Sequence, residues 1–242
     1  MTSEYTELSG RWWGAEPGEL LRDASCLLWD FDGPLCGLFA QHSATDVVVT
    51  LCHQLVALGL PAEAAKWRGT HDPLGILRSQ LPSGVAAVLE ELTAAEEEKA
   101  ASKADPTPGA DQFVRRMKKR GCRLAITSNN APRAVEAYLA AHDLEECFGD
   151  RVFGRVPESP QLMKPHPHCL ERAIEKLGVL PNECLMIGDS VMDALAAAEA
   201  GVPFLGYARH EEAARSLRAA AHVPDGVIGM APLLWATRHD EP

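Results

Sequence analysis

The sequence lacks paired cysteines and a surplus of basic residues. Its seven cysteines are scattered with no C-x-x-C pair, at positions 26, 36, 52, 122, 147, 169 and 184. An odd number of cysteines without metal-ligand spacing is typical of buried or free thiols in a reducing compartment. The net charge of -11 argues against nucleic acid and anionic membranes as partners, because both favour a basic face.

The sequence also lacks any apolar run long enough to span a bilayer, and its first thirteen residues, MTSEYTELSGRWW, are polar. We therefore expect no secretory signal, no membrane segment and a cytoplasmic protein. Residues 1–22 are interpreted as an N-terminal extension. Trp12 and Trp13 would pack this extension against the body of the protein, and no function is assigned to it.

What is present is an alternation of strand and helix patterns in a 242-residue chain of ordinary globular composition. Short apolar runs predict strands at 25–29, 122–126, 183–187 and 203–206. Helical patterns lie between or after them at 111–120, 131–142, 167–177 and 193–200. This alternation predicts an α/β fold with a doubly wound parallel sheet.

One long segment interrupts the alternation. Residues 37–104 show helical periodicity without a convincing strand, so we expect a helical insert there. The catalytic core would then comprise residues 23–36 and 105–242, and residues 105–109 read as a linker. Within the insert, the acidic run Glu96 to Glu98 is expected to be a solvated helix face.

Polar residues follow three of the expected strands at the point where each strand ends. Asp30 and Asp32 follow the first, Ser128 and Asn129 the second, and Asp189 the third. Because the carboxyl ends of parallel strands meet at one edge of a sheet, we expect these side chains to form one site.

The segments around these residues resemble the four motifs of the haloacid dehalogenase superfamily, in family order. They are DFDGPL (30–35), ITSNN (126–130), KPHP (164–167) and GDSVMD (188–193). One motif alone is a weak match, whereas four in order at strand ends are specific. The resemblance covers roughly residues 23 to 230 and implies a Rossmann-like core. It is nearest to the branch of phosphoglycolate phosphatase and β-phosphoglucomutase.

The resemblance implies the roles of five residues. Asp30 would attack phosphorus and form an acyl-phosphate, and Asp32 would act as general acid and base. Mg²⁺ would be held by Asp30, the backbone carbonyl of Asp32, and Asp189. Ser128 with neighbouring N–H groups would bind phosphate oxygens, and Lys164 would neutralise the phosphoryl charge.

Residues beside these are expected to assist them. Gly33 and Asn129 are assigned to substrate binding, and Asp193 with Ser190 to supporting Lys164. The choice of Ser128 over Thr127 as the binding hydroxyl rests on family spacing. Taken singly, each motif residue also has an ordinary interpretation, as a turn, a helix cap or solvated surface.

The helical insert resembles the α-helical cap of the superfamily. The segment from Arg68 to Pro73 breaks its helical pattern, and we expect Thr70, His71 and Asp72 to face the leaving group, with Arg68 nearby among the substrate-binding residues. The alternative is that Gly69 and Pro73 merely mark a turn between two helices.

The resemblance therefore implies a Mg²⁺-dependent phosphatase that hydrolyses a small phosphorylated metabolite through an aspartyl-phosphate, as a monomer or homodimer. A phosphomutase would use the same motifs, and a non-catalytic binding protein could share the scaffold. All the expected core residues are present, which disfavours the binding protein. A dehalogenase is disfavoured by Asp32, because dehalogenases of this superfamily lack an aspartate there.

Overall fold

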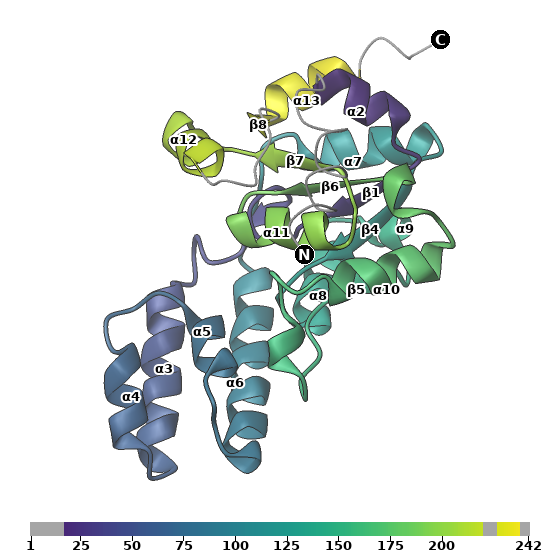
Figure 1. The fold of residues 1–242 in the computed structure, drawn as a ribbon. Coiled ribbons are helices and arrows are strands. Elements are labelled where there is room, and N and C mark those ends of the chain that lie inside the picture. The colour runs from purple at the N-terminus through teal and green to yellow at the C-terminus, as the bar shows by residue number, and fades with distance from the viewer. Residues whose placement is uncertain (1–16, 220–226, 238–242) are drawn as a thin grey trace.

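A computed structural model describes residues 17–219 and 227–237 of the chain. Its centre is a parallel six-stranded sheet with the order β5-β4-β1-β6-β7-β8 (Figure 1). The expected α/β fold with a doubly wound parallel sheet is confirmed. The strands are β1 (Cys26–Trp29), β4 (Arg123–Thr127), β5 (Val152–Phe153), β6 (Cys184–Gly188), β7 (Phe204–Tyr207) and β8 (Val227–Ile228).

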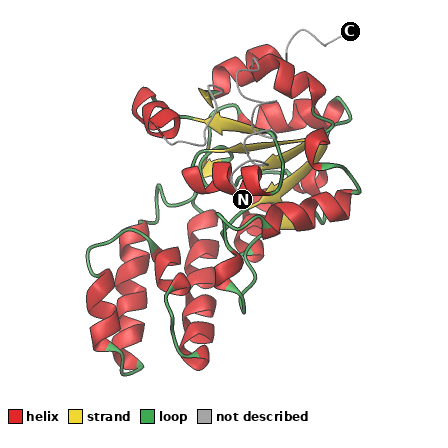
Figure 2. Cartoon of the chain, viewed as in Figure 1, coloured by secondary structure: helices red, strands yellow, loops and turns green. Residues whose placement is uncertain are grey.

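Side chains of the central strand alternate between two apolar clusters, one on each face of the sheet. Leu27 and Trp29 belong to the first cluster, and Cys26 and Leu28 to the second. Helices cover both faces (Figure 2). The first face packs against α2 (Pro17–Asp23), α7 (Ala110–Lys119), α8 (Pro132–Ala141), α9 (Glu145–Phe148) and α13 (Met230–Ala236). The second packs against α10 (His168–Leu177), α11 (Val191–Glu199) and α12 (Glu211–Ala219).

Four helices between β1 and β4 form a separate layer, at the lower left of Figure 1. They are α3 (Ala44–Ala57), α4 (Pro61–Trp67), α5 (Pro73–Arg78) and α6 (Ser83–Ala101). Their buried apolar side chains form a third cluster, which includes Val48, Leu51 and Leu89. An antiparallel pair of short strands, β2 (Cys36–Gly37) and β3 (Asp105–Pro106), joins this layer to the core. We call these four helices the cap.

Differences from the sequence-based expectations concern short elements. The four expected strands and the four expected helices of the core lie within two residues of the expected bounds, whereas α2, α9, α12 and α13 were not predicted. The edge strands β5 and β8 were not predicted, because two residues are too short to show a periodicity. The residues expected to be a linker contain β3, and short 3₁₀ helices occur at η1 (Pro160–Leu162) and η2 (Pro181–Glu183).

The expectation of a solvated acidic face on α6 is wrong for two of its three glutamates. Glu96 is 7% exposed and Glu97 is 0% exposed, whereas Glu98 is exposed. The reason is that α6 packs against α8 of the core and against α3 of the cap. Glu96 pairs there with His42 at 2.7 Å and with Lys99 at 2.6 Å.

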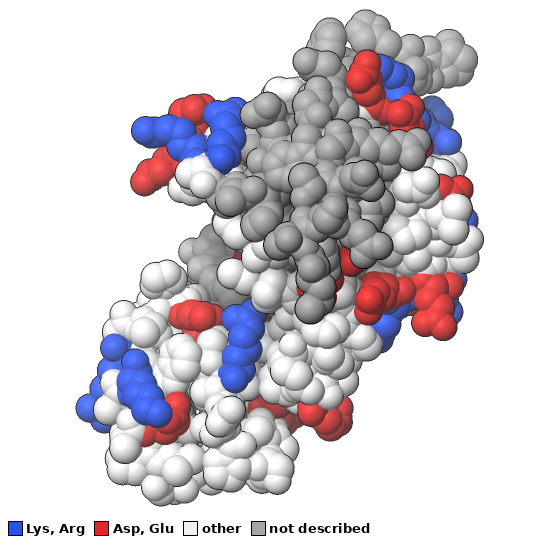
Figure 3. Space-filling model, viewed as in Figure 1, with Lys and Arg blue, Asp and Glu red and all other residues white. Residues whose placement is uncertain are grey.

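All seven cysteines are free and buried, as expected. No helix in the described ranges combines the length and the apolar character that a membrane crossing requires. On the face shown in Figure 3, acidic and basic side chains are interspersed over the described surface. Trp12 and Trp13, which were expected to pack on the body, lie outside the described residues. Residues Leu20 and Leu21 of α2 are buried in the core.

Candidate active site

A cavity of about 240 Å³ lies where the carboxyl edge of the sheet meets the cap. The ends of β1, β4 and β6 supply its floor, and the cap supplies its other wall. The core residues that line it are Asp30, Asp32, Ser128, Asn129, Asn130, Lys164, Asp189, Ser190 and Asp193. The residues on the cap side are Phe39, Ala44, His71, Asp72, Pro73 and Leu74.

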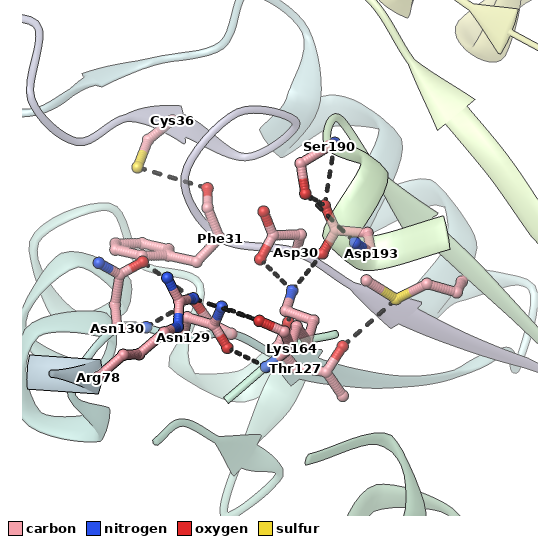
Figure 4. Close-up of polar contacts among 12 residues, drawn as sticks. Asp30, Phe31, Cys36, Arg78, Thr127, Asn129, Asn130, Lys164, Ser190 and Asp193 are labelled. Carbon is pink, nitrogen blue, oxygen red and sulfur yellow. Dashed lines mark hydrogen bonds and ion pairs between the residues drawn. The ribbon is translucent and has the colours of Figure 1, made fainter. Parts of the chain in front are cut away.

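Lys164 connects the two carboxylates at the centre of this floor (Figure 4). Its Nζ donates to Asp30 Oδ1 at 2.7 Å and to the carbonyl oxygen of Thr127 at 2.9 Å. It also donates to Asp193 Oδ1. Its side chain is 3% exposed, so its charge is neutralised by these partners rather than by solvent.

Asp193 is held by the start of its own helix. Its Oδ2 accepts hydrogen bonds from Ser190 N at 3.0 Å and Ser190 Oγ at 2.6 Å, while Asp193 N donates to Ser190 Oγ at 3.2 Å. This capping box fixes the carboxylate that faces Lys164. Gly188 is needed beside it, because a Cβ at that position would lie 2.6 Å from Asp193 Cβ.

The Asp189 side chain lines the cavity and packs directly against Gly33. Gly33 has φ +125°, and a Cβ there would lie 2.1 Å from Asp189 Oδ2. Glycine is therefore required on both steric and conformational grounds. The N–H of Gly33 donates to the carbonyl of Cys36 at 2.8 Å, so this N–H stabilises the turn and is not available to a ligand. Asp32 Oδ1 accepts the N–H of Leu38 at 2.9 Å.

The loop after β4 distinguishes the two candidate hydroxyls. Thr127 Oγ1 lies 3.4 Å from Met186 Sδ, inside the core, whereas Ser128 lines the cavity. Ser128 Oγ donates to Asn130 Oδ1 at 3.0 Å and accepts from Asn130 N at 3.1 Å. Asn129 Oδ1 and Nδ2 bind the backbone N–H and C=O of Lys164, at 2.7 and 3.1 Å. These bonds of Asn129 position Lys164.

The sequence did not reveal a buried ionic network that supports this loop. Glu97 of the cap accepts hydrogen bonds from Asn130 Nδ2 and Ala131 N, each at 2.9 Å. Arg155, which follows β5, binds Glu97 at 2.7 and 2.8 Å and Glu90 at 2.8 and 2.9 Å. Glu90 and Glu97 stand seven residues apart and so share one face of α6, which was the available signal.

A second supporting residue, Arg209, follows β7. Its Nη2 donates to the carbonyls of Gly33 at 2.7 Å and Cys36 at 2.6 Å. Thr107 Oγ1 donates to the same Gly33 carbonyl at 2.8 Å. Together they hold the turn that follows β1. The rule that polar residues at strand ends converge would have indicated Arg209, had it been applied to the fourth strand.

The clustered carboxylates are strongly perturbed. Burial and the Asp193 carboxylate raise the pKa of Asp30 to about 7, while the charge and the hydrogen bond of Lys164 act in the opposite direction. Burial and the Asp30 carboxylate raise the pKa of Asp189 to about 8. Burial lowers the pKa of Lys164, but Asp193 and Asp30 outweigh this and hold it above its usual value. Burial also raises the pKa of Asp32.

The donor set fits a divalent cation with oxygen ligands. Oxygen atoms of Asp30, Asp189 and Asp193 lie within 4.8 Å of one another. Both oxygens of Asp193 are occupied, by Lys164 and by Ser190. Hard carboxylate oxygens are the ligands that Mg²⁺ prefers, and Asp30 with Asp189 are the members of this group best placed to provide them.

The cap residues expected at the leaving group separate into two pairs. His71 and Asp72 line the cavity. Thr70 and Arg68 do not, because the turn after α4 directs them elsewhere. Thr70 Oγ1 donates to the carbonyl of Trp67 at 2.9 Å, which closes that turn. Arg68 lines a separate cavity of about 220 Å³ with Val48, Val49, Cys52, His53 and Gly69.

The sequence and the fold both resemble those of known proteins. A family model of haloacid dehalogenase-like hydrolases matches residues 25–201. A phosphoglycolate phosphatase of Haemophilus influenzae is 32% identical over 99 residues, 41% of this chain and 43% of that protein. The pyrophosphatase PpaX of Bacillus cereus is 35% identical over 90 residues, 37% of this chain and 40% of that protein. The matches thus span less than half the length of these relatives.

A solved structure extends the likeness over most of the fold. CbbY from Rhodobacter sphaeroides, solved in complex with phosphate, aligns with a TM-score of 0.58 and 21% identity. The alignment covers 87% of this chain and 99% of that one. At this identity the likeness shows that the two proteins share a fold.

Proposed function

Because the chain belongs to the haloacid dehalogenase-like hydrolases, we propose that it hydrolyses small phosphate monoesters through an aspartyl-phosphate intermediate with the help of Mg²⁺. The phosphatase and the pyrophosphatase among its relatives support phosphate as the group transferred. The observation that carries the proposal is the contact of Lys164 with both Asp30 and Asp193 in one cavity, beside Asp189.

In the first step, a carboxylate oxygen of Asp30 attacks phosphorus and the bond from phosphorus to the leaving oxygen breaks. Asp32 gives its proton to that oxygen, so that the product leaves as an alcohol. The pKa of Asp32, raised by burial, favours the protonated form that this step requires.

In the second step, water attacks the phosphorus of the acyl-phosphate, and Asp32 takes a proton from that water. The bond between Asp30 and phosphorus breaks, and inorganic phosphate and the Asp30 carboxylate are released. Asp32 ends the cycle protonated, so charge and protons balance over the two steps.

Three further residues prepare the phosphoryl site. Lys164 supplies a fixed positive charge next to Asp30, and Ser128 offers a hydroxyl to a phosphoryl oxygen. Asp30, Asp189 and the backbone carbonyl of Asp32 would hold Mg²⁺. When bound, Mg²⁺ offsets the repulsion between the carboxylates and the phosphoryl group.

The test is Asp30→Asn, assayed for phosphate release from p-nitrophenyl phosphate with Mg²⁺. We expect a loss of at least about a thousandfold, because the amide is a poor nucleophile. Asp46→Asn is the matched control and should keep full activity, because Asp46 is an exposed residue of α3 that does not line the cavity. Full turnover by Asp30→Asn would remove the nucleophile from the proposal.

A phosphomutase is the second candidate, because it would need the same site. The discriminating measurement is product analysis with a sugar phosphate. Free inorganic phosphate in stoichiometric amounts supports the hydrolase. An isomeric sugar phosphate without free phosphate would establish the mutase instead.

A further inference from the structure

The wall of the cavity that faces away from the phosphoryl site is formed by the cap and by the segments that adjoin α3 and α5. Phe39, Ala44, Pro73 and Leu74 make most of this wall apolar, and the polar side chains on it are His71 and Asp72. A phosphoryl group placed against Lys164 would direct its leaving group toward this wall. The charge on the wall therefore bears on which esters can be accommodated.

Asp72 is a fixed negative charge on that wall. It is the N-cap of α5, where its Oδ1 accepts the N–H of Gly75 at 2.8 Å. Gly75 has no side chain, and a Cβ there would lie 2.4 Å from Asp72 Oδ2. The hydrogen bond from Gly75 N holds this carboxylate at the start of α5, and glycine at position 75 leaves the space that the carboxylate occupies.

No arginine or lysine of the cap lines the described part of the cavity. Arg68 lies in a separate cavity. Arg78 donates to the carbonyl oxygen of Lys164 at 3.2 Å and is not among the residues that line the site. Lys164 itself is already paired with Asp30 and Asp193. On the described lining of the cap side, a second anionic group of the substrate would therefore meet Asp72 and no lysine or arginine.

We propose that the enzyme selects phosphate esters whose leaving group is short and carries no negative charge, a neutral or amine-bearing alcohol. This inference rests on the proposed phosphatase activity. A cavity of about 240 Å³ suits an ester with a few carbon atoms beyond the phosphoryl group. Like charges brought together in a confined site oppose binding, so esters of hydroxy acids are discriminated against.

Three esters of equal chain length isolate the charge of the leaving group. They are 2-aminoethyl phosphate, 2-hydroxyethyl phosphate and phosphoglycolate, which carry a cation, a neutral hydroxyl and a carboxylate. With Mg²⁺ present, we expect kcat/KM for phosphoglycolate to be at least about tenfold below that for 2-hydroxyethyl phosphate, a factor that one unfavourable contact readily produces. The value for 2-aminoethyl phosphate should equal or exceed that for 2-hydroxyethyl phosphate.

Asp72→Asn removes the charge while keeping an oxygen that can cap α5, since asparagine is as good an N-cap as aspartate. We expect the ratio of kcat/KM for phosphoglycolate over 2-hydroxyethyl phosphate to rise about tenfold. The ratio for 2-aminoethyl phosphate over 2-hydroxyethyl phosphate should fall. Asp46→Asn, an equal change of charge outside the cavity, should leave both ratios as they are in the unaltered enzyme.

The outcomes separate this inference from the proposed function. Equal or better hydrolysis of phosphoglycolate by the unaltered enzyme would overturn the inference and leave the hydrolase intact. Ratios that do not change in Asp72→Asn would do the same. Phosphate release from p-nitrophenyl phosphate but from none of the three esters would also overturn it. No release from any of the four compounds would overturn both.

Discussion

Replacing Arg155 with methionine should strongly destabilise the protein. The guanidinium is 0% exposed and pairs with Glu97, also 0% exposed, and with Glu90, which is 10% exposed. Methionine fills a similar volume but leaves both carboxylates buried without their cation. Breaking a buried pair by removing one partner costs about 3 to 5 kcal/mol. For a chain of this size we therefore expect the melting temperature to fall by about 6 to 20 °C.

A matched control crosses the same interface between α6 and the core. Arg133 of α8 pairs with Glu91 of α6 at 2.9 Å, with side chains that are 39% and 73% exposed. Exposed pairs contribute about 1 kcal/mol or less, so Arg133→Met should lower the melting temperature by about 4 °C at most. Urea unfolding followed by circular dichroism gives both free energies of unfolding. Equal losses in the two variants would refute the reasoning.

A second substitution distinguishes two possible causes of the lower stability of Arg155→Met. If stranded charge is responsible, adding Glu97→Gln to Arg155→Met should restore part of the stability, because it removes one buried carboxylate. If lost packing is responsible, the second substitution should lower the free energy of unfolding further. We also expect Arg155→Met to lower kcat/KM, since Glu97 holds Asn130 and Ala131 beside Ser128.

Three other predictions concern the cavity directly. Gly33→Ala should lower kcat/KM by about a hundredfold or more, because its Cβ displaces Asp189 and misplacing a catalytic group by about 1 Å has such an effect; activity within threefold of the unaltered enzyme would contradict this. Lys164→Met should abolish phosphate release while Mg²⁺ still raises the melting temperature, and a variant that turns over normally would exclude Lys164 from the chemistry. Without metal, the pKa values of about 7 for Asp30 and about 8 for Asp189 lie above those of the unfolded chain, so stability should fall as pH rises from about 4 to 8. The melting temperature should accordingly gain more from Mg²⁺ at pH 8 than at pH 5.5, and equal gains at both values would count against this account.

The residues that the sequence identified share a simple geometric property. Asp30 and Asp32 lie within three residues of each other at a strand end, and the stretch from Gly188 to Asp193 spans one strand end and the first turn of a helix. Such short segments fix the relative directions of their side chains by strand and helix geometry alone. Convergence of the segments then follows from the parallel sheet, since its carboxyl ends share one edge.

The residues that the sequence did not identify depend on contacts between distant segments. Glu97 of α6 meets Arg155 and Asn130 only because α6 packs on the core, and nothing local specifies that packing. An acidic run on a helix is most often solvated, so the expectation of solvent exposure was wrong for Glu96 and Glu97. The expectation for the turn from Arg68 to Asp72 was incomplete for a different reason. Its turn residues were recognised, but the direction of each side chain depends on backbone angles that composition does not determine.

The site and the network beneath it differ in how their buried charges are balanced. In the network, Arg155 contacts both carboxylates directly, so each has a cation within hydrogen-bond distance. In the site, the three carboxylates of Asp30, Asp189 and Asp193 face the single ammonium group of Lys164, so the fully ionised group carries an excess of two negative charges. Folding alone would not favour this excess, because buried unpaired charge is destabilising. The glycines at 33 and 188 nevertheless let the carboxylates approach closely. A divalent cation would supply the two positive charges that balance this excess. The same clustering of carboxylates that lowers the stability of the folded chain therefore favours the binding of Mg²⁺ and phosphate.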